Sequence, residues 1–345
     1  MKYGIYGFGK SPENLKGLKN TDRITSNWNK LAANFAVQER MDFFYCSPAF
    51  LREDPDSDFC IDASGKPHKD YACPNSDRTL EHTGRKILEI AKNPLVSGVT
   101  IDGGRFPSLV CSAGWEPFFS CFCPRCMAKM EEQGIDSRLL RHNIAALAHY
   151  LHAPNSRDPE ELERFRPFIS PWLAFREQSV TAYTNALCQN LKACGKPVGG
   201  FVFPPSLTRL VGQNCVELAY TFISPMLYRH YQEAYGPACL DKEMIAWYEM
   251  TAKLSEEQRL TMASLFSLPT DLFLGEERLR RQGYPPEIIF SELQTAKYRT
   301  KKPLVPIILL EDERLEESIA AALSAGVKNL DFFQYQEGLP GIALL

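Results

Sequence analysis

The chain has 345 residues, of which 44 % are hydrophobic and 23 % are charged. This is the balance of a folded globular chain that buries a sizeable core, which excludes a disordered protein. The 39 basic and 42 acidic residues give a net charge of −3 with no long run of either sign, so the sequence offers no electrostatic footprint for nucleic acid or for an anionic membrane.

Residues 1–17 lack the apolar core and the small-residue cleavage site of a signal peptide. No apolar run approaches the roughly 20 residues that a membrane-spanning helix needs. These features predict a cytoplasmic protein. The eleven cysteines are scattered through the chain, which favours reduced thiols, some of them metal ligands, over a disulfide framework.

Short apolar runs bounded by Gly, Pro or Asp are typical of buried parallel strands. They occur at residues 3–8, 41–46, 96–101, 198–203, 222–227, 304–310 and 327–333. Helical patterns accompany them at residues 79–91, 125–132, 137–151, 177–193, 254–265, 286–298 and 315–325. The alternation of strand and helix predicts an α/β fold with a parallel sheet and right-handed crossovers.

The strand count is one short of a closed (β/α)8 TIM barrel, and we expect the missing strand within residues 9–40. A doubly wound open sheet would also alternate, but it usually carries a G-x-G-x-x-G loop, and Gly4, Gly7 and Gly9 do not form one. We therefore predict a single barrel domain over residues 1–345, least regular in its N-terminal part. Two long polar loops, at about 47–78 and 103–135, follow strand ends, where a barrel places its functional loops.

Cys121, Cys123 and Cys126 form a C-x-C-x-x-C run at the start of a predicted helix, and Cys73 lies on an earlier loop. Four thiolates satisfy tetrahedral Zn²⁺, and the tight spacing lets three sulfurs converge from one turn. We predict zinc at these four residues; an iron–sulfur cluster and buried free thiols are the alternatives. A closed site of four cysteines has no position for water, so the zinc would be structural and would join two loops. Two other cysteines are rival fourth ligands, namely Cys60 and Cys111.

Residues 70–130 contain, in order, a Cys-Pro-Asn segment that leads into a helix, the strand end Val-Thr-Ile-Asp-Gly-Gly-Arg-Phe-Pro and the run Cys-Phe-Cys-Pro-Arg-Cys. This order resembles the glycoside hydrolases related to family 42 β-galactosidases, in which a similar run and an upstream Cys-Pro bind structural zinc on a barrel. Weaker similarities follow at residues 172–176, 224–228 and 320–335. Family 42 enzymes place Asn-Glu at the end of the fourth strand as general acid/base, whereas this sequence has Ile101-Asp102-Gly103. The resemblance therefore implies a glycosidase barrel, but neither galactosidase activity nor the same acid.

Glycosidic bond cleavage generally needs two carboxyl groups, one protonated and one ionised. Asp102 directly follows the apolar run at 96–101, a position at which barrel carboxylates face the substrate. Glu311 ends the run at 304–310, where the resembling glycosidases place a nucleophile. We expect Asp102 to be the acid/base and Glu311 the nucleophile or base. The alternatives are an Asp102 that caps a loop and pairs with Arg105, and a Glu311 that only favours the start of a helix.

Sugar faces stack on aromatic rings, so aromatic and polar side chains near strand ends are candidates for substrate binding. We expect this role for Arg105, Trp115, Tyr228, His230 and Tyr335. Asp331, inside the last predicted strand, is a third candidate carboxylate. The predicted partner is a carbohydrate substrate.

Two other functions stay open on the sequence. A zinc-thiolate methyltransferase on the same barrel would need three protein ligands and an open metal position. A non-catalytic carbohydrate-binding barrel would not need the two carboxylates to flank one bond. The sequence has no G-x-S-x-G, H-E-x-x-H or P-loop motif, which argues against an esterase, a zincin or a nucleotide hydrolase.

Overall fold

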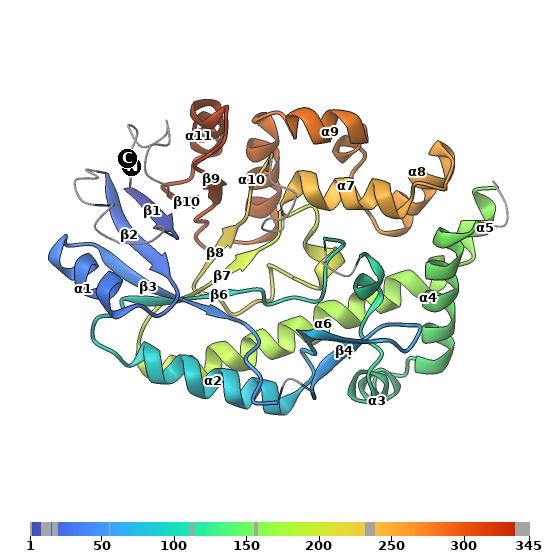
Figure 1. The fold of residues 1–345 in the computed structure, drawn as a ribbon, viewed down its shortest axis with the longest axis horizontal. Helices are drawn as coiled ribbons and strands as arrows, with labels where there is room; N and C mark the ends of the chain where they lie inside the picture. Colours follow the sequence, from blue (N-terminus) through green and yellow to red (C-terminus); the bar gives the residue numbers. More distant parts are fainter. Residues whose placement is uncertain are drawn as a thin grey trace.

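The computed structural model describes residues 2–7, 15, 20–54, 56–110, 114–154, 158–231 and 239–334. Eight strands form one parallel sheet that curls round on itself (Figure 1). In chain order they are β1 (Lys2–Tyr6), β2 (Thr21–Ser26), β3 (Asp42–Pro48), β6 (Gly98–Asp102), β7 (Val198–Val202), β8 (Phe222–Pro225), β9 (Ile307–Leu309) and β10 (Asn329–Phe333).

The strands pair in the order β8-β7-β6-β3-β2-β1-β10-β9. Two isolated parallel bridges bring the two ends of this order together: Ile223 of β8 pairs with Leu304, just before β9, and Met226, just after β8, pairs with Ile307 of β9. The protein is therefore a (β/α)8 TIM barrel, as the sequence predicts. The strand expected within residues 9–40 is β2. The run at 304–310 is regular strand only at Ile307–Leu309.

Large side chains and glycines share the barrel interior. Phe44 of β3 is the register partner of Gly98 of β6, and a Cβ atom on Gly98 would lie 2.6 Å from the Phe44 ring. Phe222 of β8 and Gly199 of β7 repeat this relation at 2.1 Å. The two phenylalanine rings meet at a centroid distance of 5.8 Å. Glycine is required at both positions because a methyl group would overlap a packed ring.

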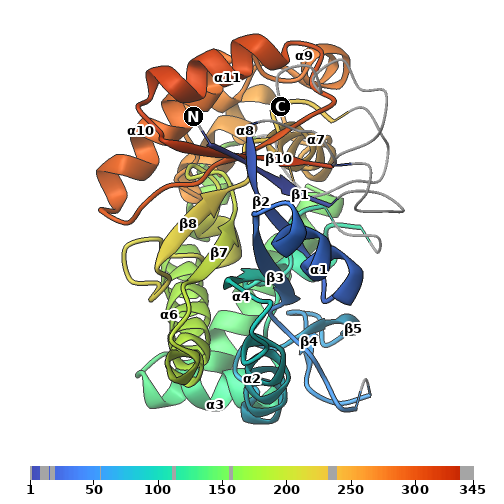
Figure 2. The same cartoon turned by 90° about the vertical axis from the view of Figure 1, so that its left-hand side faces the viewer.

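Helices surround the barrel (Figure 2). They include α1 (Lys30–Gln38), α2 (Asp77–Ala91), α6 (Arg166–Leu191), α10 (Glu287–Arg299) and α11 (Leu315–Ser324). The Asn29 side chain accepts hydrogen bonds at the start of α1, and the Ser76 side chain does the same at the start of α2, which satisfies backbone donors that a helix leaves unpaired. The sequence pattern predicted only the second half of α6, because Pro171 lies inside the helix and proline normally interrupts one.

Further elements extend the fold beyond the C-terminal ends of the strands (Figure 1). They are the antiparallel hairpin β4 (Phe59–Ile61) and β5 (Pro67–Ala72), helices α3 (Pro124–Glu132), α4 (Ser137–His152), α5 (Glu160–Glu163), α7 (Leu240–Met250), α8 (Glu256–Leu265) and α9 (Glu276–Gln282), and 3-10 turns at Glu116–Phe119, Thr208–Val211 and Thr270–Leu272. A further 3-10 turn, Lys192–Cys194, follows α6 and leads into β7. A bridge between Asp62 and Ser120 joins the hairpin to the segment after β6. The connections that follow β3 and β6 are thus held against each other.

Within the described ranges, no helix has both the length and the apolar character needed to cross a bilayer.

Candidate active site and metal centre

Asp102 is the last residue of β6 and lies at the C-terminal end of the barrel. The hydroxyl of Tyr6, from β1, donates a hydrogen bond to Asp102 Oδ2 at 3.2 Å. The thiol of Cys46, from β3, donates to the Tyr6 oxygen at 3.7 Å. Gly103 follows with φ = 73°, a conformation that favours glycine, so the chain turns directly after the carboxyl group. Side chains from three strands therefore converge at Asp102.

Burial raises the pKa of the Asp102 carboxyl. The Arg105 guanidinium, the Tyr6 hydroxyl and the backbone of Gly103 favour the ionised form and oppose that rise without cancelling it. A carboxyl group with a raised pKa keeps its proton nearer to neutral pH, as a general acid must.

Aromatic rings pack beside Asp102 in the barrel interior. The Tyr6 ring lies 4.7 Å from that of Phe201 and 5.1 Å from that of Phe333, measured between centroids. Tyr228, one of the predicted substrate-binding residues, stacks on Phe333 at 5.3 Å and is only 1 % exposed. These rings exclude water from the inner side of the carboxyl group.

A hollow of about 250 Å³ opens beside Asp102. Arg105 also lines it, together with Arg52, Asp70 and Tyr71 from the loop after β3 and from β5. The Arg105 guanidinium lies 4.6 Å from the Phe203 ring centroid. The predicted residues Asp102 and Arg105 thus line one concave surface at the C-terminal end of the barrel, where TIM-barrel enzymes place their active sites.

Glu243, in the first turn of α7, was not predicted as a functional residue. It is 2 % exposed, and its Oε2 accepts a hydrogen bond from the backbone N–H of Leu109 at 3.1 Å. Burial raises the pKa of Glu243 to about 7, against the opposing effects of the Ser108 side chain and the Arg105 guanidinium. Glu243 is too enclosed to touch a substrate, and it anchors the segment after Asp102 to α7. The feature of the sequence that could have indicated a role for Glu243 is the presence of an acidic residue among the apolar residues of this helix.

Glu311 and His230 line a second, smaller hollow of about 50 Å³. Glu311 follows β9 and is exposed. His230 Nδ1 lies 3.0 Å from Oδ2 of Asp241, a fully buried residue of α7, and this contact orients the imidazole. Asp102 lines the first hollow and Glu311 the second. Asp312, next to Glu311, has a structural role, because its side chain accepts a hydrogen bond from Arg229 Nε at 2.9 Å.

The remaining predicted residues lie elsewhere. Trp115 stacks on His152 at a centroid distance of 4.5 Å, and it lines neither hollow. Tyr335 lies outside the described residues. Asp331 is buried in β10 and forms an ion pair with Arg23 of β2. Gly4 leaves room for it, because a Cβ atom there would lie 2.1 Å from Asp331 Oδ1.

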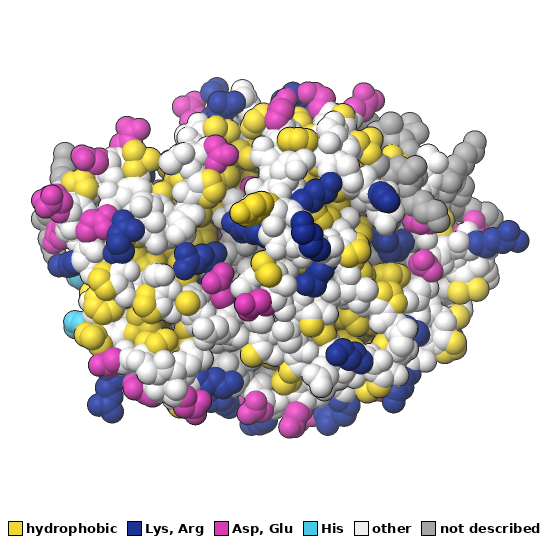
Figure 3. All heavy atoms as spheres, turned by 180° about the vertical axis from the view of Figure 1, so that it is seen from behind, with side chains coloured by type: hydrophobic (Ala, Val, Ile, Leu, Met, Phe, Trp, Pro, Cys, Tyr) yellow, Lys and Arg dark blue, Asp and Glu magenta, His cyan; other side chains and the backbone are white. Residues whose placement is uncertain are grey.

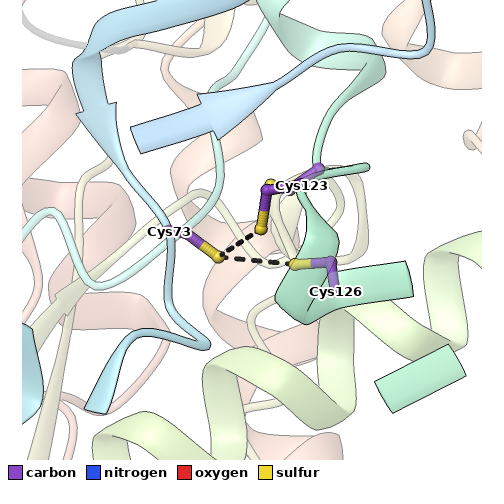
Figure 4. A group of neighbouring side chains, drawn as sticks. Cys73, Cys123 and Cys126 are labelled. Carbon is purple, nitrogen blue, oxygen red and sulfur yellow. Dashed lines mark hydrogen bonds between the residues drawn. The ribbon is translucent and has the colours of Figure 1, made fainter. Parts of the chain in front are cut away.

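The four predicted metal ligands come together. Cys73 follows β5, and Cys121, Cys123 and Cys126 lie around the start of α3. Their Sγ atoms all lie within 4.8 Å of one another, and all four side chains are buried. Cys73 Sγ is 3.4 Å from that of Cys126 and 3.6 Å from that of Cys123 (Figure 4). This group of four is called the cysteine cluster below.

The surroundings of the cysteine cluster fit a bound cation. The backbone N–H of Asn75 donates to Cys73 Sγ at 3.4 Å, and its side-chain amide donates to Cys126 Sγ at 3.3 Å and to Ser179 Oγ at 2.9 Å. Donors directed at sulfur stabilise thiolates. Four thiolates buried within 4.8 Å of one another would repel, so a positive charge among them favours their joint ionisation.

Of the two rival ligands, Cys60 is not a member of the group of four sulfurs. The Cys60 thiol donates to the carbonyl oxygen of Ala72 at 3.3 Å, and Cys111 lies outside the described residues. None of the cysteines in the described ranges forms a disulfide.

No known protein family matches the sequence, and no curated protein matches it significantly. Solved structures are similar in fold. The glycoside hydrolase domain of PgaB (BpsB) from Bordetella bronchiseptica superposes with a TM-score of 0.55 at 12 % identity, over 97 % of this chain and 90 % of that domain.

Two other solved structures are similar at lower TM-scores. A β-galactosidase from Bacillus circulans sp. alkalophilus has a TM-score of 0.49 at 13 % identity, over 96 % of this chain and 50 % of that enzyme. A GH18 chitinase from Pseudoalteromonas aurantia has a TM-score of 0.46 at 9 % identity, over 100 % and 98 % of the two chains. At such identities the likeness concerns the fold, and the resemblance to family 42 stays a prediction from residues 70–130. The protein has the TIM-barrel fold of the PgaB glycoside hydrolase domain.

Proposed function

We propose that this protein is a glycoside hydrolase that cleaves a carbohydrate substrate by carboxylate acid/base catalysis, with Asp102 as the general acid. The observation that carries the proposal is the environment of Asp102: a carboxyl group with a raised pKa at the end of the fourth barrel strand, beside an open hollow. The fold shared with the PgaB glycoside hydrolase domain supports the same class of reaction.

In this mechanism protonated Asp102 gives its proton to the leaving-group oxygen as the glycosidic bond breaks. Tyr6 holds the carboxyl group through its hydrogen bond to Oδ2. Arg105 favours the carboxylate that forms when the proton has left. The aromatic rings of the barrel interior keep water from that side, so the proton passes to the substrate.

Glu311 is the second carboxyl group of the proposal. Its place after the seventh strand, beside His230, supports a role as nucleophile or as base for water. A separation of about 5 to 5.5 Å between the two carboxyl groups gives retention at the anomeric carbon, and about 6.5 to 9.5 Å gives inversion. Proton NMR of the first product released distinguishes the two outcomes.

Substrate contacts are proposed for the predicted residues according to their surroundings. Arg105 and His230 line the two hollows, so they are the first candidates for hydrogen bonds to sugar hydroxyls. Tyr228 would support substrate binding indirectly, through the Phe333 ring on which it stacks. Trp115 and Tyr335 stay predictions from the sequence.

We further propose that the cysteine cluster binds one zinc ion in a structural role. Four thiolates are the donor set that zinc prefers in such sites, and a ligand set of four leaves no open position for a reacting group. Bound zinc would supply a tetrahedral cross-link between the segment after β5 and the start of α3. This argues against the zinc-thiolate methyltransferase, which needs a vacant ligand position.

Asp102→Asn tests the proposed general acid. The variant and the wild type are assayed on a panel of aryl glycosides and oligosaccharides, with Asp70→Asn as the matched control because Asp70 lines the same hollow. We expect Asp102→Asn to lower kcat/KM by about 10²- to 10⁴-fold, the usual contribution of general acid catalysis, and Asp70→Asn to stay near the wild-type value. Both variants should melt close to the wild type.

Two outcomes would contradict the proposal. Full turnover by Asp102→Asn would remove Asp102 from the mechanism. Binding of an oligosaccharide without hydrolysis by the wild type, and with equal affinity in Asp102→Asn, would instead favour the non-catalytic carbohydrate-binding barrel.

A further inference from the structure

A third concave surface lies at the N-terminal end of the barrel, opposite to the end that holds Asp102. It is a hollow of about 430 Å³, formed where the segments that lead into β9 and β10 run side by side. The two strands are paired, and Lys297 of α10 donates a hydrogen bond to the carbonyl oxygen of Ala325 after α11. The walls of this hollow are therefore fixed by the barrel itself.

In the part of the chain that the structure describes, four lysines and no acidic residue line this surface, which is called the lysine hollow below. The charge follows from the sequence, because residues 293–310 contain four basic and no acidic side chains and residues 318–330 contain no acidic side chain. Among the described residues no carboxylate oxygen lies within 4.0 Å of the four ammonium groups. Figure 3 shows Lys and Arg side chains gathered near the middle of the back face of the molecule, on the side where α10 lies. The lysines are Lys297, Lys301, Lys302 and Lys328.

The four lysines differ in their hydrogen bonds. Lys297 donates to Ala325, and Lys302 donates to the carbonyl oxygen of Val216 at 3.1 Å. Both lysines thus donate to backbone carbonyls, and the carbonyl of Ala325 lies at the C-terminal end of α11, where a cation is favourable. Lys301 and Lys328 are exposed, and among the described residues neither donates such a hydrogen bond. Their presence beside two further cations raises the local repulsion, which a bound anion would relieve.

We propose that the lysine hollow binds a small phosphorylated molecule. Ammonium groups are compact donors that bind phosphate oxygens as point charges. The side chains of Thr300 and Asn329 also line the surface and add neutral polar groups, while Leu304 and Val327 supply an apolar wall for the organic part of the ligand. The volume of about 430 Å³ suits a small molecule, and the net charge of −3 disfavours a long polyanion.

This site does not depend on the proposed glycosidase function. The residues that line the lysine hollow lie at the N-terminal ends of β9 and β10. Asp102 is the last residue of β6 and lies at the opposite end of the barrel. A ligand in the lysine hollow would therefore leave the Asp102 hollow open.

Inorganic triphosphate is the probe for the test, and binding is measured by titration calorimetry at low ionic strength, where screening is weak. The double variant Lys301→Ala/Lys328→Ala removes the two lysines without a structural partner. Lys30→Ala/Lys86→Ala is the matched control, because it removes two exposed lysines on α1 and α2, which pack on β3. Melting curves verify that all proteins are folded.

We expect one triphosphate per wild-type chain, binding weakened about tenfold or more in the first double variant, and binding within about twofold of the wild type in the control. Triphosphate should also protect Lys301 and Lys328 from reductive methylation. Absence of binding to the wild type, or equal weakening in the two double variants, would overturn the proposal. A short single-stranded oligonucleotide that bound more tightly than triphosphate, and lost affinity in the first double variant only, would overturn the assignment to a small molecule.

Discussion

Replacing Glu243 by glutamine should make the protein more stable than the wild type at pH 8 and leave the two nearly equal at pH 4. Burial raises the pKa of this carboxyl from 4.5 to about 7. Each pKa unit corresponds to about 1.4 kcal/mol, so ionising Glu243 costs about 3 kcal/mol more in the folded chain than in the unfolded chain. Glutamine keeps an oxygen acceptor for the Leu109 N–H and carries no charge.

The direction with pH follows from proton binding. Between pH 4.5 and pH 7 the folded chain holds more protons at Glu243 than the unfolded chain does. The stability of the wild type therefore falls across this window as the pH rises. The glutamine variant lacks this contribution, so its advantage should grow from near zero to about 3 kcal/mol by pH 8.

Urea unfolding at several pH values between 4 and 8, followed by circular dichroism, measures this advantage as a shift of the midpoint at constant m. Comparison with the wild type at each pH cancels any change in metal binding. Glu89→Gln, which removes an exposed carboxyl on α2, controls for the loss of one charge. An advantage of Glu243→Gln that stayed constant from pH 4 to pH 8 would refute the reasoning.

Three further predictions concern other parts of the molecule. Tyr6→Phe removes the hydrogen bond that favours ionised Asp102, so the alkaline limb of the kcat/KM profile should move to higher pH; an unchanged or acid-shifted limb would contradict the assignment. Cys73→Ser should lower the zinc content from one ion per chain, as measured by elemental analysis, and lower the Tm, whereas a wild type without metal would argue for free thiols. Gly4→Ala places a methyl group 2.1 Å from Asp331 Oδ1 and should cost about 1 to 3 kcal/mol in urea unfolding; wild-type stability would show that this ion pair can move aside.

The barrel was predictable from the sequence because most of its strands are continuous apolar runs, as expected when both faces of a parallel sheet are buried. β2 was placed only within a range, since its sequence Thr-Asp-Arg-Ile-Thr-Ser contains one large apolar residue. Arg23 of this strand is only partly exposed, because it pairs with the buried Asp331. Because this charged residue lies within β2, the sequence of a strand in the barrel resembles that of a polar loop.

Helix α7 was missed for the opposite reason. Its residues are buried on nearly every side, Asp241 and Glu243 included, so the sequence has no polar face to reveal a helical period. The roles of both acids followed only from their neighbours in space. The hairpin β4–β5 was missed because Pro67–Ala72 is short and largely polar.

The candidate site was predictable where it depends on strand ends. Asp102 follows an apolar run, and that position alone places it at the C-terminal end of the barrel. The cysteine spacing likewise indicated a cluster. The link between Tyr6 and Asp102 was not predictable, since it spans 96 residues and depends on the curvature that brings β1 and β6 across the barrel.

The two glycine–phenylalanine pairs in the barrel interior constrain how this chain can evolve. Enlarging residue 98 while Phe44 is present creates an overlap at 2.6 Å, whereas shrinking residue 44 first leaves a cavity, which costs about 3 to 5 kcal/mol but keeps the fold. Residue 44 must therefore become smaller, with the loss of stability that the cavity causes, before a larger residue can replace Gly98. In related chains, positions 44 and 98 should covary with a conserved total volume, and positions 222 and 199 should do the same.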